Sequence, residues 1–274
     1  MYLYSGKTDI GYNRTYNEDY LYIKNLDKTE KNEDYLAMVL DGNGTNMGRN
    51  DNADMKVIPS TLLGHEISSI LSEIYENNRE MLYSYPVDCL KMAVSCANKV
   101  LGGFKMGSEE DYGGFSSTIT MYFLHNDTIH YLHAGNSRLY LLRVLPDNTT
   151  KFVQLTKDQT KAQGLVDAGL IQPADYYINP DRLVLNSGLG IFANPEFQTG
   201  SIPLQTNDIL LTTTDGIHYA LSQKDLENII YNNKTLDEAV EQMITDAFNF
   251  KNIDNMTAPV SYTHLRAHET DSYL

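Results

Sequence analysis

The sequence predicts an α+β fold, because strands and helices occur in separate runs and do not alternate one by one. Of its 274 residues, 42% are hydrophobic, which suffices for one large domain or at most two. Three strands are expected first, at 8–11, 20–25 and 34–40, and two amphipathic helices then follow at about 60–77 and 87–105. Antiparallel sheets with helices on their outer faces are therefore favoured over a parallel doubly wound sheet.

A second run of strands is expected after a glycine-rich loop between Gly102 and Gly114. Turn signals at Asn126-Asp127 and around Pro146 separate its members. The four predicted strands are expected to form one meander and cover residues 117–124, 128–134, 137–144 and 151–155.

The segment 156–190 has an irregular pattern, with a short helix expected around 162–168. It is interpreted either as a mobile flap or as an ordinary surface excursion. Further on, Ser222 with Asp225 three residues later is typical of a helix N-terminus, and this helix is expected to extend to Ile230.

Two apolar runs stop at the dipeptide Asp-Gly, once at Asp41-Gly42 and once at Asp215-Gly216. Asp-Gly often forms a two-residue hairpin turn, but a hairpin requires a second strand directly afterwards, and neither site has one. Each is therefore interpreted as a buried strand that carries a carboxylate to an edge, where a ligand set would be rigidly held. Asp254 and the pair Glu18-Asp19 are further acids of this kind. Acids gathered in this way usually hold a hard metal ion.

Composition argues against several classes of partner. The net charge of −15, from 21 basic and 36 acidic residues, disfavours binding to nucleic acid or to an anionic membrane. No apolar run approaches the length of a membrane span, and residues 1–6 lack a secretion signal, so a cytoplasmic location is expected. Cys89 and Cys96 lie about 10 Å apart along one predicted helix, too far for a disulfide, and both are predicted to be buried.

Eight segments, in order along nearly the whole chain, carry a recognisable pattern: 8–11 with Arg14 and 17–19, 41–44, 114–118, 133–140, 155–160, 166–169 with 186–190, 214–216, and 254–256. Together they resemble the motifs of the PPM (type 2C) family of metal-dependent serine/threonine protein phosphatases, in its compact bacterial-like form. The resemblance implies a four-layer α-β-β-α sandwich, in which two packed antiparallel sheets carry helices on both outer faces.

The resemblance also implies a site for two Mg²⁺ or Mn²⁺ ions, which prefer oxygen ligands. Asp41 would bridge the two ions, and the backbone carbonyl of Gly42 would be a further ligand. The other implied groups are Asp215 and Asp254 on one ion, Glu18 on the other, and Asp19 behind a bound water. A water between the ions would lose a proton near neutral pH and attack phosphorus in line.

Arg14 matches the phosphate-binding arginine of the family, since a guanidinium fork suits two phosphate oxygens. The alternative for Arg14 is a surface salt bridge. The implied substrates are proteins phosphorylated on serine or threonine, with a serine/threonine kinase as the opposing enzyme. A monomer is the default expectation.

The chain departs from the family pattern at two positions. Asn43 stands where many members have a histidine thought to protonate the leaving group, and an amide has no useful pKa for that task. Asn136 replaces an aspartate associated with a third, weaker ion, so a third ion is expected to bind poorly or not at all. These departures leave open a catalytically silent relative that binds phosphoproteins as a regulator. An unrelated acidic binding domain is the remaining alternative.

Residues 1–260 are expected to form a single catalytic domain with the flap at 156–190. The segment 261–274 does not resemble the end of the family and is interpreted as an artefact or a frayed end. Because Pro259 and then polar residues follow Asp254-Asn255, the closing strand is expected to be incomplete.

Overall fold

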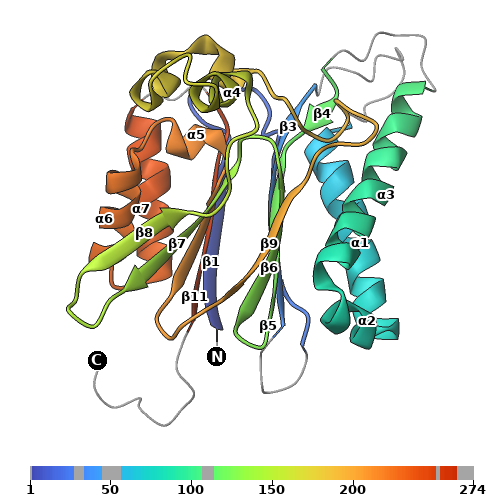
Figure 1. Ribbon diagram of the computed structural model, residues 1–274, viewed down its shortest axis with the longest axis horizontal. Helices are drawn as coiled ribbons and strands as arrows, with labels where there is room; N and C mark the ends of the chain where they lie inside the picture. Colours follow the sequence, from blue (N-terminus) through green and yellow to red (C-terminus); the bar gives the residue numbers. More distant parts are fainter. Residues whose placement is uncertain (1, 28–33, 45–56, 107–113, 251–253, 264–274) are drawn as a thin grey trace.

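Two antiparallel sheets lie face to face in the computed structural model, and helices cover the outer face of each (Figure 1). The predicted four-layer α-β-β-α sandwich is therefore confirmed. The structure describes residues 2–27, 34–44, 57–106, 114–250 and 254–263.

The first sheet has five strands in the order β1-β11-β10-β7-β8. The N-terminal strand β1 thus pairs with the last strand β11, and Asp9 lies opposite Met256. The bounds of the strands are β1 Tyr2–Asp9, β7 Arg138–Val144, β8 Thr150–Gln154, β10 Ile209–Thr213 and β11 Met256–Thr263.

The second sheet has the order β2-β3-β5-β6-β9, with the two-residue strand β4 paired to the end of β3. Strand β3 lies between the edge strand β2 and β5, and Asp41 on β3 lies directly opposite Asp19 on β2. The bounds are β2 Asp19–Asn25, β3 Tyr35–Asn43, β4 Ser116–Ser117, β5 Ile119–His125, β6 Thr128–Ala134 and β9 Gln198–Pro203.

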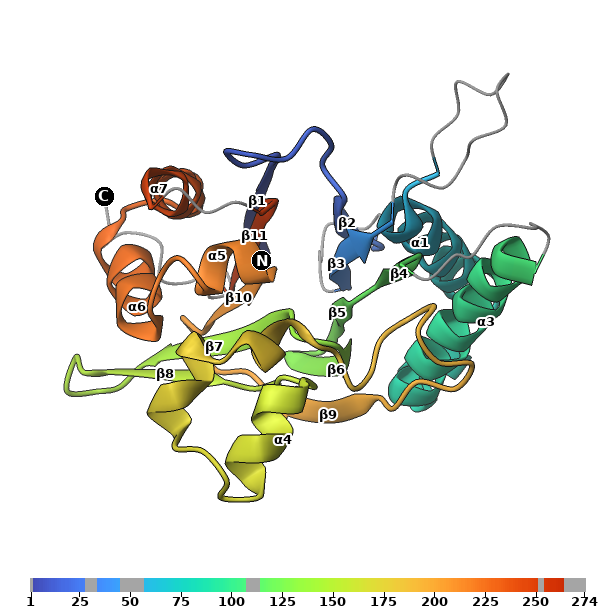
Figure 2. The same cartoon turned by 90° about the horizontal axis from the view of Figure 1, so that it is seen from above.

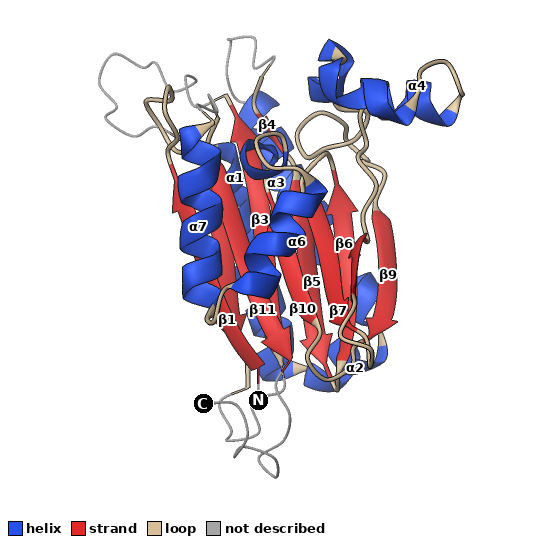
Figure 3. Cartoon of the chain, turned by 90° about the vertical axis from the view of Figure 1, so that its left-hand side faces the viewer, coloured by secondary structure: helices blue, strands red, loops and turns tan. Residues whose placement is uncertain are grey.

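Each outer face is covered by its own set of helices (Figures 2 and 3). The second sheet carries α1 Pro59–Asn77, α2 Arg79–Ser84 and α3 Pro86–Met106, whereas the first carries α5 Asp215–His218, α6 Gln223–Asn232 and α7 Leu236–Asn249. A separate group lies at the same end of the sandwich as β4 (Figure 1): α4 Lys161–Asp167 and the 3₁₀ turns η1 Pro173–Ile178 and η2 Pro180–Leu183.

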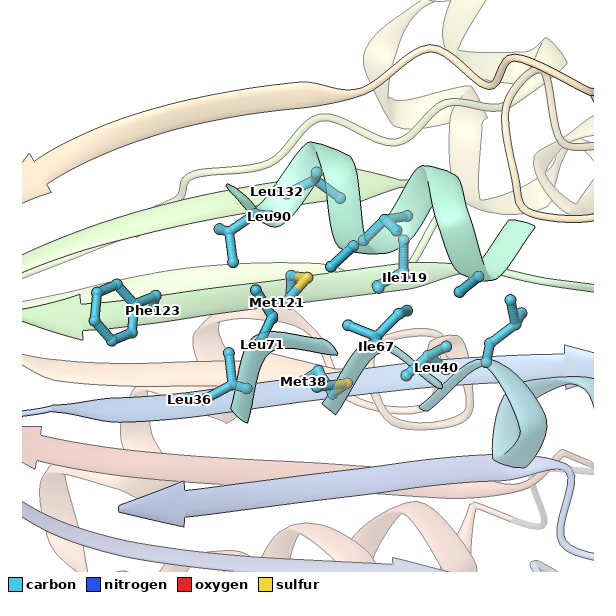
Figure 4. Packing of buried hydrophobic residues seen from close by; sticks show 14 of the residues in the cluster. Leu36, Met38, Leu40, Ile67, Leu71, Leu90, Ile119, Met121, Phe123 and Leu132 are labelled. Carbon is cyan, nitrogen blue, oxygen red and sulfur yellow. The ribbon is translucent and has the colours of Figure 1, made fainter. Parts of the chain in front are cut away.

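Alternation along β3 explains why this strand is buried on both sides. Leu36, Met38 and Leu40 face α1 and α3 (Figure 4), whereas Tyr35 and Ala37 belong to the core between the two sheets, because successive side chains of a strand point to opposite faces. A third apolar cluster joins the first sheet to α5, α6 and α7. The site-bearing strands are therefore held from both sides.

The predicted elements agree with the structure for α1, α3 and α6, and Ser222 caps α6 in a capping box with Asp225, as expected. Three predictions were wrong. The first strand covers Tyr2–Asp9 and not 8–11. Gly102 lies within α3 and not in a loop, because burial of neighbouring Leu101 outweighs the low helix propensity of glycine. The predicted run of four strands is divided, with β5 and β6 in one sheet and β7 and β8 in the other.

Two further predictions were wrong, one about the closing strand and one about the burial of Cys96. The closing strand is complete, since β11 pairs along its whole length with β1 and reaches Thr263. Proline cannot donate a ladder hydrogen bond, but Pro259 lies just before Val260, where the paired stretch with β10 begins. Cys89 is buried as expected, whereas Cys96 is exposed. Residues 264–274 of the predicted tail lie outside the described residues.

Candidate metal centre

The predicted acids come from distant parts of the chain, and three of them line one cleft of about 330 Å³. The second sheet, the start of α5 and the segment before β11 each contribute one carboxylate, and the flap contributes apolar side chains. The lining residues are Arg14, Asp41, Gly42, Asn43, Ser116, Ser117, Thr118, Asn136, Leu183, Leu185, Ile191, Asp215 and Asp254.

Asp41 lies within β3 and not after its end, because β3 continues to Asn43 and pairs there with β4. Both the backbone N–H and the backbone carbonyl of Asp41 make hydrogen bonds. The N–H donates to Thr118 Oγ1 over 3.1 Å, and the carbonyl accepts from Thr118 N and Ser117 Oγ, each at 2.9 Å. The Asp41 carboxylate is thus presented from a rigid strand.

Gly42 brings the backbone of Glu18 against β3. The Gly42 N–H donates to Glu18 O over 3.0 Å, and Ser60 Oγ donates to the same carbonyl. A Cβ at position 42 would lie 2.6 Å from Glu18 O and 2.9 Å from Ser60 Oγ, so only glycine allows this close approach. Glu18 is therefore carried to the edge of the acidic cleft.

Gly216 allows a similarly close approach between the backbone segments that carry Asp215 and Asp254. A Cβ at position 216 would lie 1.9 Å from the carbonyl oxygen of Asn255, so the start of α5 lies directly against the segment that carries Asp254. The Asn255 side chain then joins this segment to the N-terminal loop. Its Oδ1 accepts from Glu18 N at 2.8 Å, and its Nδ2 donates to the carbonyl of Tyr16 at 3.0 Å.

Arg14 supplies the positive charge of the cleft. Its Nη2 lies 2.7 Å from Asp254 Oδ1 and 2.9 Å from Asp254 Oδ2. Its Nη1 lies 3.7 Å from Glu18 Oε2. Two roles were considered for Arg14, phosphate binding and a salt bridge, and the position of its guanidinium in the cleft is compatible with both. In this structure the guanidinium is paired with the carboxylates of Asp254 and Glu18.

Asp19 lies behind Asp41, buried below the cleft. Its Oδ2 accepts from Thr214 Oγ1 at 2.8 Å and from Thr257 Oγ1 at 2.7 Å, whereas its Oδ1 has no protein partner. Burial raises the pKa of Asp19 to about 7, although the two threonine hydroxyls oppose the shift. An unpartnered buried oxygen of this kind is costly and has spare capacity to accept a hydrogen bond from water.

The neighbouring acids are similarly crowded. Desolvation raises the pKa of Asp41 well above its usual range, and the charges of Asp215 and Asp19 add to the effect. Burial and the charge of Asp254 raise the pKa of Asp215 to about 6, opposed by a hydrogen bond from Asn136. Bringing a cation here would relieve this repulsion.

The donor set fits hard divalent ions, because carboxylates and backbone carbonyls provide only oxygen. Within the described residues, no three histidine, cysteine, aspartate or glutamate side chains are grouped tightly enough to form a site by themselves. Mg²⁺ in proteins usually keeps several waters and takes few direct protein ligands.

Asn136 and Asn43 occupy different surroundings. Asn136 is buried, and its Nδ2 donates to Asp215 Oδ2 over 3.0 Å, so it presents its amide N–H rather than its oxygen to this carboxylate. Asn43 lies exposed at the cleft, where β3 ends. Poor binding of a third ion at Asn136 stays a prediction.

Several supporting residues were not predicted from the sequence. Thr214 and Thr257 hold Asp19, and Asn255 joins the loops that carry Glu18 and Asp254. The position of Thr214 directly before Asp215, and of Asn255 directly after Asp254, is a local signal that could have drawn attention to two of them. Nothing local connects Thr257 with Asp19.

Comparison with known proteins gives the same class of fold. No protein-family model matches the sequence. A curated serine/threonine phosphatase, Stp of Listeria welshimeri, is 26% identical over 224 residues, which cover 78% of this chain and 86% of that protein. The serine/threonine phosphatase structure from S. agalactiae superposes with a TM-score of 0.78 at 24% identity, covering 96% of this chain and all of that one (100%).

A further structure, the catalytic domain of the serine/threonine protein phosphatase PstP in complex with 2 manganese ions, gives a TM-score of 0.73 at 22% identity, covering 96% and 99% of the two chains. The chain thus has the class of fold that these bacterial phosphatase structures share. Within that class, the chain is a relative of the bacterial PPM-type serine/threonine phosphatases, and the resemblance drawn from its motifs is confirmed.

Proposed function

We propose that this chain is a Mg²⁺- or Mn²⁺-dependent phosphatase that hydrolyses phosphoserine and phosphothreonine in proteins. The observation that carries the proposal is the acidic cleft, which is lined by the carboxylates of Asp41, Asp215 and Asp254 and by Arg14, whose guanidinium is paired with Asp254. The names of the curated relatives and the manganese complex of a structural neighbour support the same activity.

The residues that would hold two divalent ions are carboxylates and one backbone carbonyl: Glu18, Asp19, Asp41, Gly42, Asp215 and Asp254. When bound, such ions would supply an activated water and neutralise the charge of the phosphate. The protein contributes the geometry, since the Asp41 backbone is fixed by Ser117 of β4 and by Thr118, and the Glu18 backbone is fixed by Gly42.

Arg14 would bind two oxygens of the substrate phosphate through its guanidinium fork. Its present partners, Asp254 at 2.7 Å and Glu18 at 3.7 Å, show how far the side chain reaches into the cleft. Once these carboxylates held ions, Arg14 would be free to bind the phosphate. Asp19 would orient a water through Oδ1, its oxygen without a protein partner.

The leaving alkoxide must receive a proton, and Asn43 cannot supply one. A water in the open part of the cleft would donate it. Leu183, Leu185 and Ile191 form an apolar wall on the flap side of the same cleft. This wall would contact the side chains that flank the phosphorylated residue and exclude bulk water from it.

The test is turnover of p-nitrophenyl phosphate and of a phosphothreonine peptide with Mn²⁺, with and without chelator. Asp41→Asn and Asp215→Asn are compared with Asp181→Asn, whose carboxylate makes a surface salt bridge to Lys161. We expect chelator-sensitive turnover in the parent and in Asp181→Asn, and a loss of at least about 100-fold in the two cleft variants. Equal turnover in chelator would contradict metal dependence.

The second candidate function, a silent relative that binds phosphoproteins, is favoured by Asn43 and Asn136. It would be established if Mn²⁺ binds in calorimetry but neither substrate is hydrolysed.

We also propose that residues 1–260 act as one catalytic domain with 156–190 as its flap. Within the described residues, no helix is long and apolar enough to cross a membrane. The cytoplasmic location, the opposing kinase and the monomeric state stay predictions.

A further inference from the structure

The flap is anchored at its base by a buried ion pair. Arg138 donates from Nε and Nη2 to the two oxygens of Asp158 at 2.8 and 2.7 Å, and both residues are buried. The two ends of the flap are joined by a bridge between Thr160 and Leu185. The base is therefore rigid, and the distal part depends on other contacts.

In the distal flap, Tyr176 is the aromatic side chain that points into the protein. It is buried, whereas Leu170 and Ile178 are 71% and 80% exposed. The Tyr176 hydroxyl donates to Asp158 Oδ2 and lies 3.3 Å from the hydroxyl of Tyr219. Tyr219 follows directly after α5, the helix that begins at Asp215.

Tyr219 also contacts the second 3₁₀ turn of the flap. Its hydroxyl donates to the carbonyl of Arg182 over 3.1 Å, and the guanidinium of Arg182 lies 4.9 Å from the centre of its ring. Arg182 directly precedes Leu183, which lines the cleft. Tyr219 thus contacts both 3₁₀ turns, and its contact with Arg182 lies directly before Leu183 of the apolar wall.

Asn136 connects this tyrosine to the metal centre. Its Nδ2 lies 3.4 Å from Tyr219 Oη and 3.0 Å from Asp215 Oδ2. An amide nitrogen has two hydrogens and can serve both acceptors at once. A continuous chain of hydrogen bonds therefore leads from the Asp215 carboxylate through Asn136 and Tyr219 to the flap.

We propose that Asn136 and Tyr219 are positioning residues that couple ion occupancy at Asp215 to closure of the flap over the cleft. The inference rests on the proposed metal centre. An ion at Asp215 would fix this carboxylate, and thereby the acceptor that orients the Asn136 amide. In the absence of an ion, the charges of Asp254 and Asp41 would repel Asp215, so the Asn136 amide would have a less fixed acceptor and the flap would open more often.

Thermodynamic linkage makes the coupling reciprocal: whatever factor the ion contributes to flap closure, the closed flap contributes to ion affinity. Removing the Tyr219 hydroxyl should therefore change two independent quantities by the same factor. One is the protection of flap amides from hydrogen exchange, and the other is the dissociation constant for Mn²⁺.

The experiment uses the full chain, Tyr219→Phe and, as matched control, Tyr177→Phe. Tyr177 is 49% exposed on the same flap, and its ring meets that of Tyr176 edge to face. Hydrogen exchange over residues 161–185 is measured by mass spectrometry in Mn²⁺ and in chelator, and Mn²⁺ affinity by calorimetry. We expect Mn²⁺ to slow flap exchange at least about 5-fold in the parent and control. In Tyr219→Phe this protection should vanish and Mn²⁺ affinity should fall by a similar factor.

The outcomes separate the inference from the proposed function. If the parent binds Mn²⁺ but Tyr219→Phe keeps the full Mn²⁺-dependent protection, the coupling is refuted while the metal centre stands. If the parent gives no Mn²⁺ binding, the proposed function fails and the coupling with it. Asn136→Ala serves as a second variant, and its melting temperature in chelator verifies folding. It must reproduce the loss seen in Tyr219→Phe, since it breaks the same chain one link earlier.

Discussion

Asp19 and Asp41 lie directly opposite one another on the antiparallel strands β2 and β3, so two acids share one cross-strand pair. Like charges in this position destabilise a sheet, and here Asp215 and Asp254 add to the repulsion. The fold accepts this cost near the end of the largely buried strand β3. Four predictions follow from the charge and the packing around this pair.

Asp41→Asn should raise the stability of the ion-free protein while it weakens Mn²⁺ binding. The amide removes one charge from a crowded group, in which burial and then the neighbouring carboxylates raise the pKa of Asp41. We expect a gain of about 1 kcal/mol in chelator, which is a rise of about 2–4 °C in melting temperature for a domain of this size. Differential scanning calorimetry with and without Mn²⁺ measures both effects. An unchanged or lower melting temperature in chelator would show that the repulsion is not a significant cost.

The affinity for Mn²⁺ should fall as the pH falls through 7 and 6. The pKa values of Asp19 and Asp215 are raised to about 7 and about 6, so the ion-free protein holds protons there that binding must release. The same raised pKa values also determine how the stability of the ion-free protein depends on pH. Between the ordinary value near 4 and the raised pKa, the folded ion-free state binds more protons than the unfolded state, so these groups make it less stable as pH rises.

Calorimetric titrations of Mn²⁺ at pH 5.5 to 8, in buffers of different ionisation enthalpy, measure the affinity and the number of protons released. The share of proton release that comes from Asp19 and Asp215 should shrink as the pH rises toward 8, because both carboxyls become ionised before the ion binds. Affinity that is independent of pH over this range would contradict the raised pKa values of the two carboxyls.

Arg14→Ala should lower kcat/KM for p-nitrophenyl phosphate by about 10–100-fold, because one or two charge-assisted hydrogen bonds are lost. Mn²⁺ affinity should stay the same or increase, since Asp254 loses a partner at 2.7 Å that competes with the ion. Steady-state kinetics and calorimetry separate the two effects. The control is Arg79→Ala, whose guanidinium lies over Tyr75 at 4.5 Å on the outer helices. A parallel loss of Mn²⁺ affinity in Arg14→Ala would assign Arg14 to the ion site instead of the phosphate.

Gly216→Ala should destabilise the protein by about 3 kcal/mol and weaken Mn²⁺ binding. Its Cβ would meet a backbone carbonyl at 1.9 Å, so Asn255 and with it Asp254 must move away from Asp215. The control is Gly103→Ala in α3, where nothing lies within 4 Å of the added Cβ. There alanine should add about 0.5–1 kcal/mol through helix propensity. Urea unfolding measures the change in the free energy of unfolding, which should be negative for Gly216→Ala and positive for Gly103→Ala. Destabilisation of equal size in both variants would contradict the packing argument.

Part of the candidate site was predictable from short stretches of sequence. Asp41-Gly42 and Asp215-Gly216 end apolar runs, and this local pattern identified two of the three acids that line the cleft. Local patterns were less informative about exact bounds, since β3 continues through Asp41 to Asn43. The short strand β4 pairs with this end of β3, and that pairing depends on residues more than 70 positions away.

The sequence by itself determined the α+β class, the order of the motifs that relate the chain to bacterial phosphatases, and the acids of the cleft. Only the tertiary structure decided which groups meet. Asp19 is held by Thr214 and Thr257, almost 240 positions away in the second case, and Asn136 joins Asp215 to the flap. Hydrophobic periodicity specifies which face of each element is buried, but a hydrogen bond between distant side chains depends on how two sheets and three apolar cores pack together, which no local pattern records.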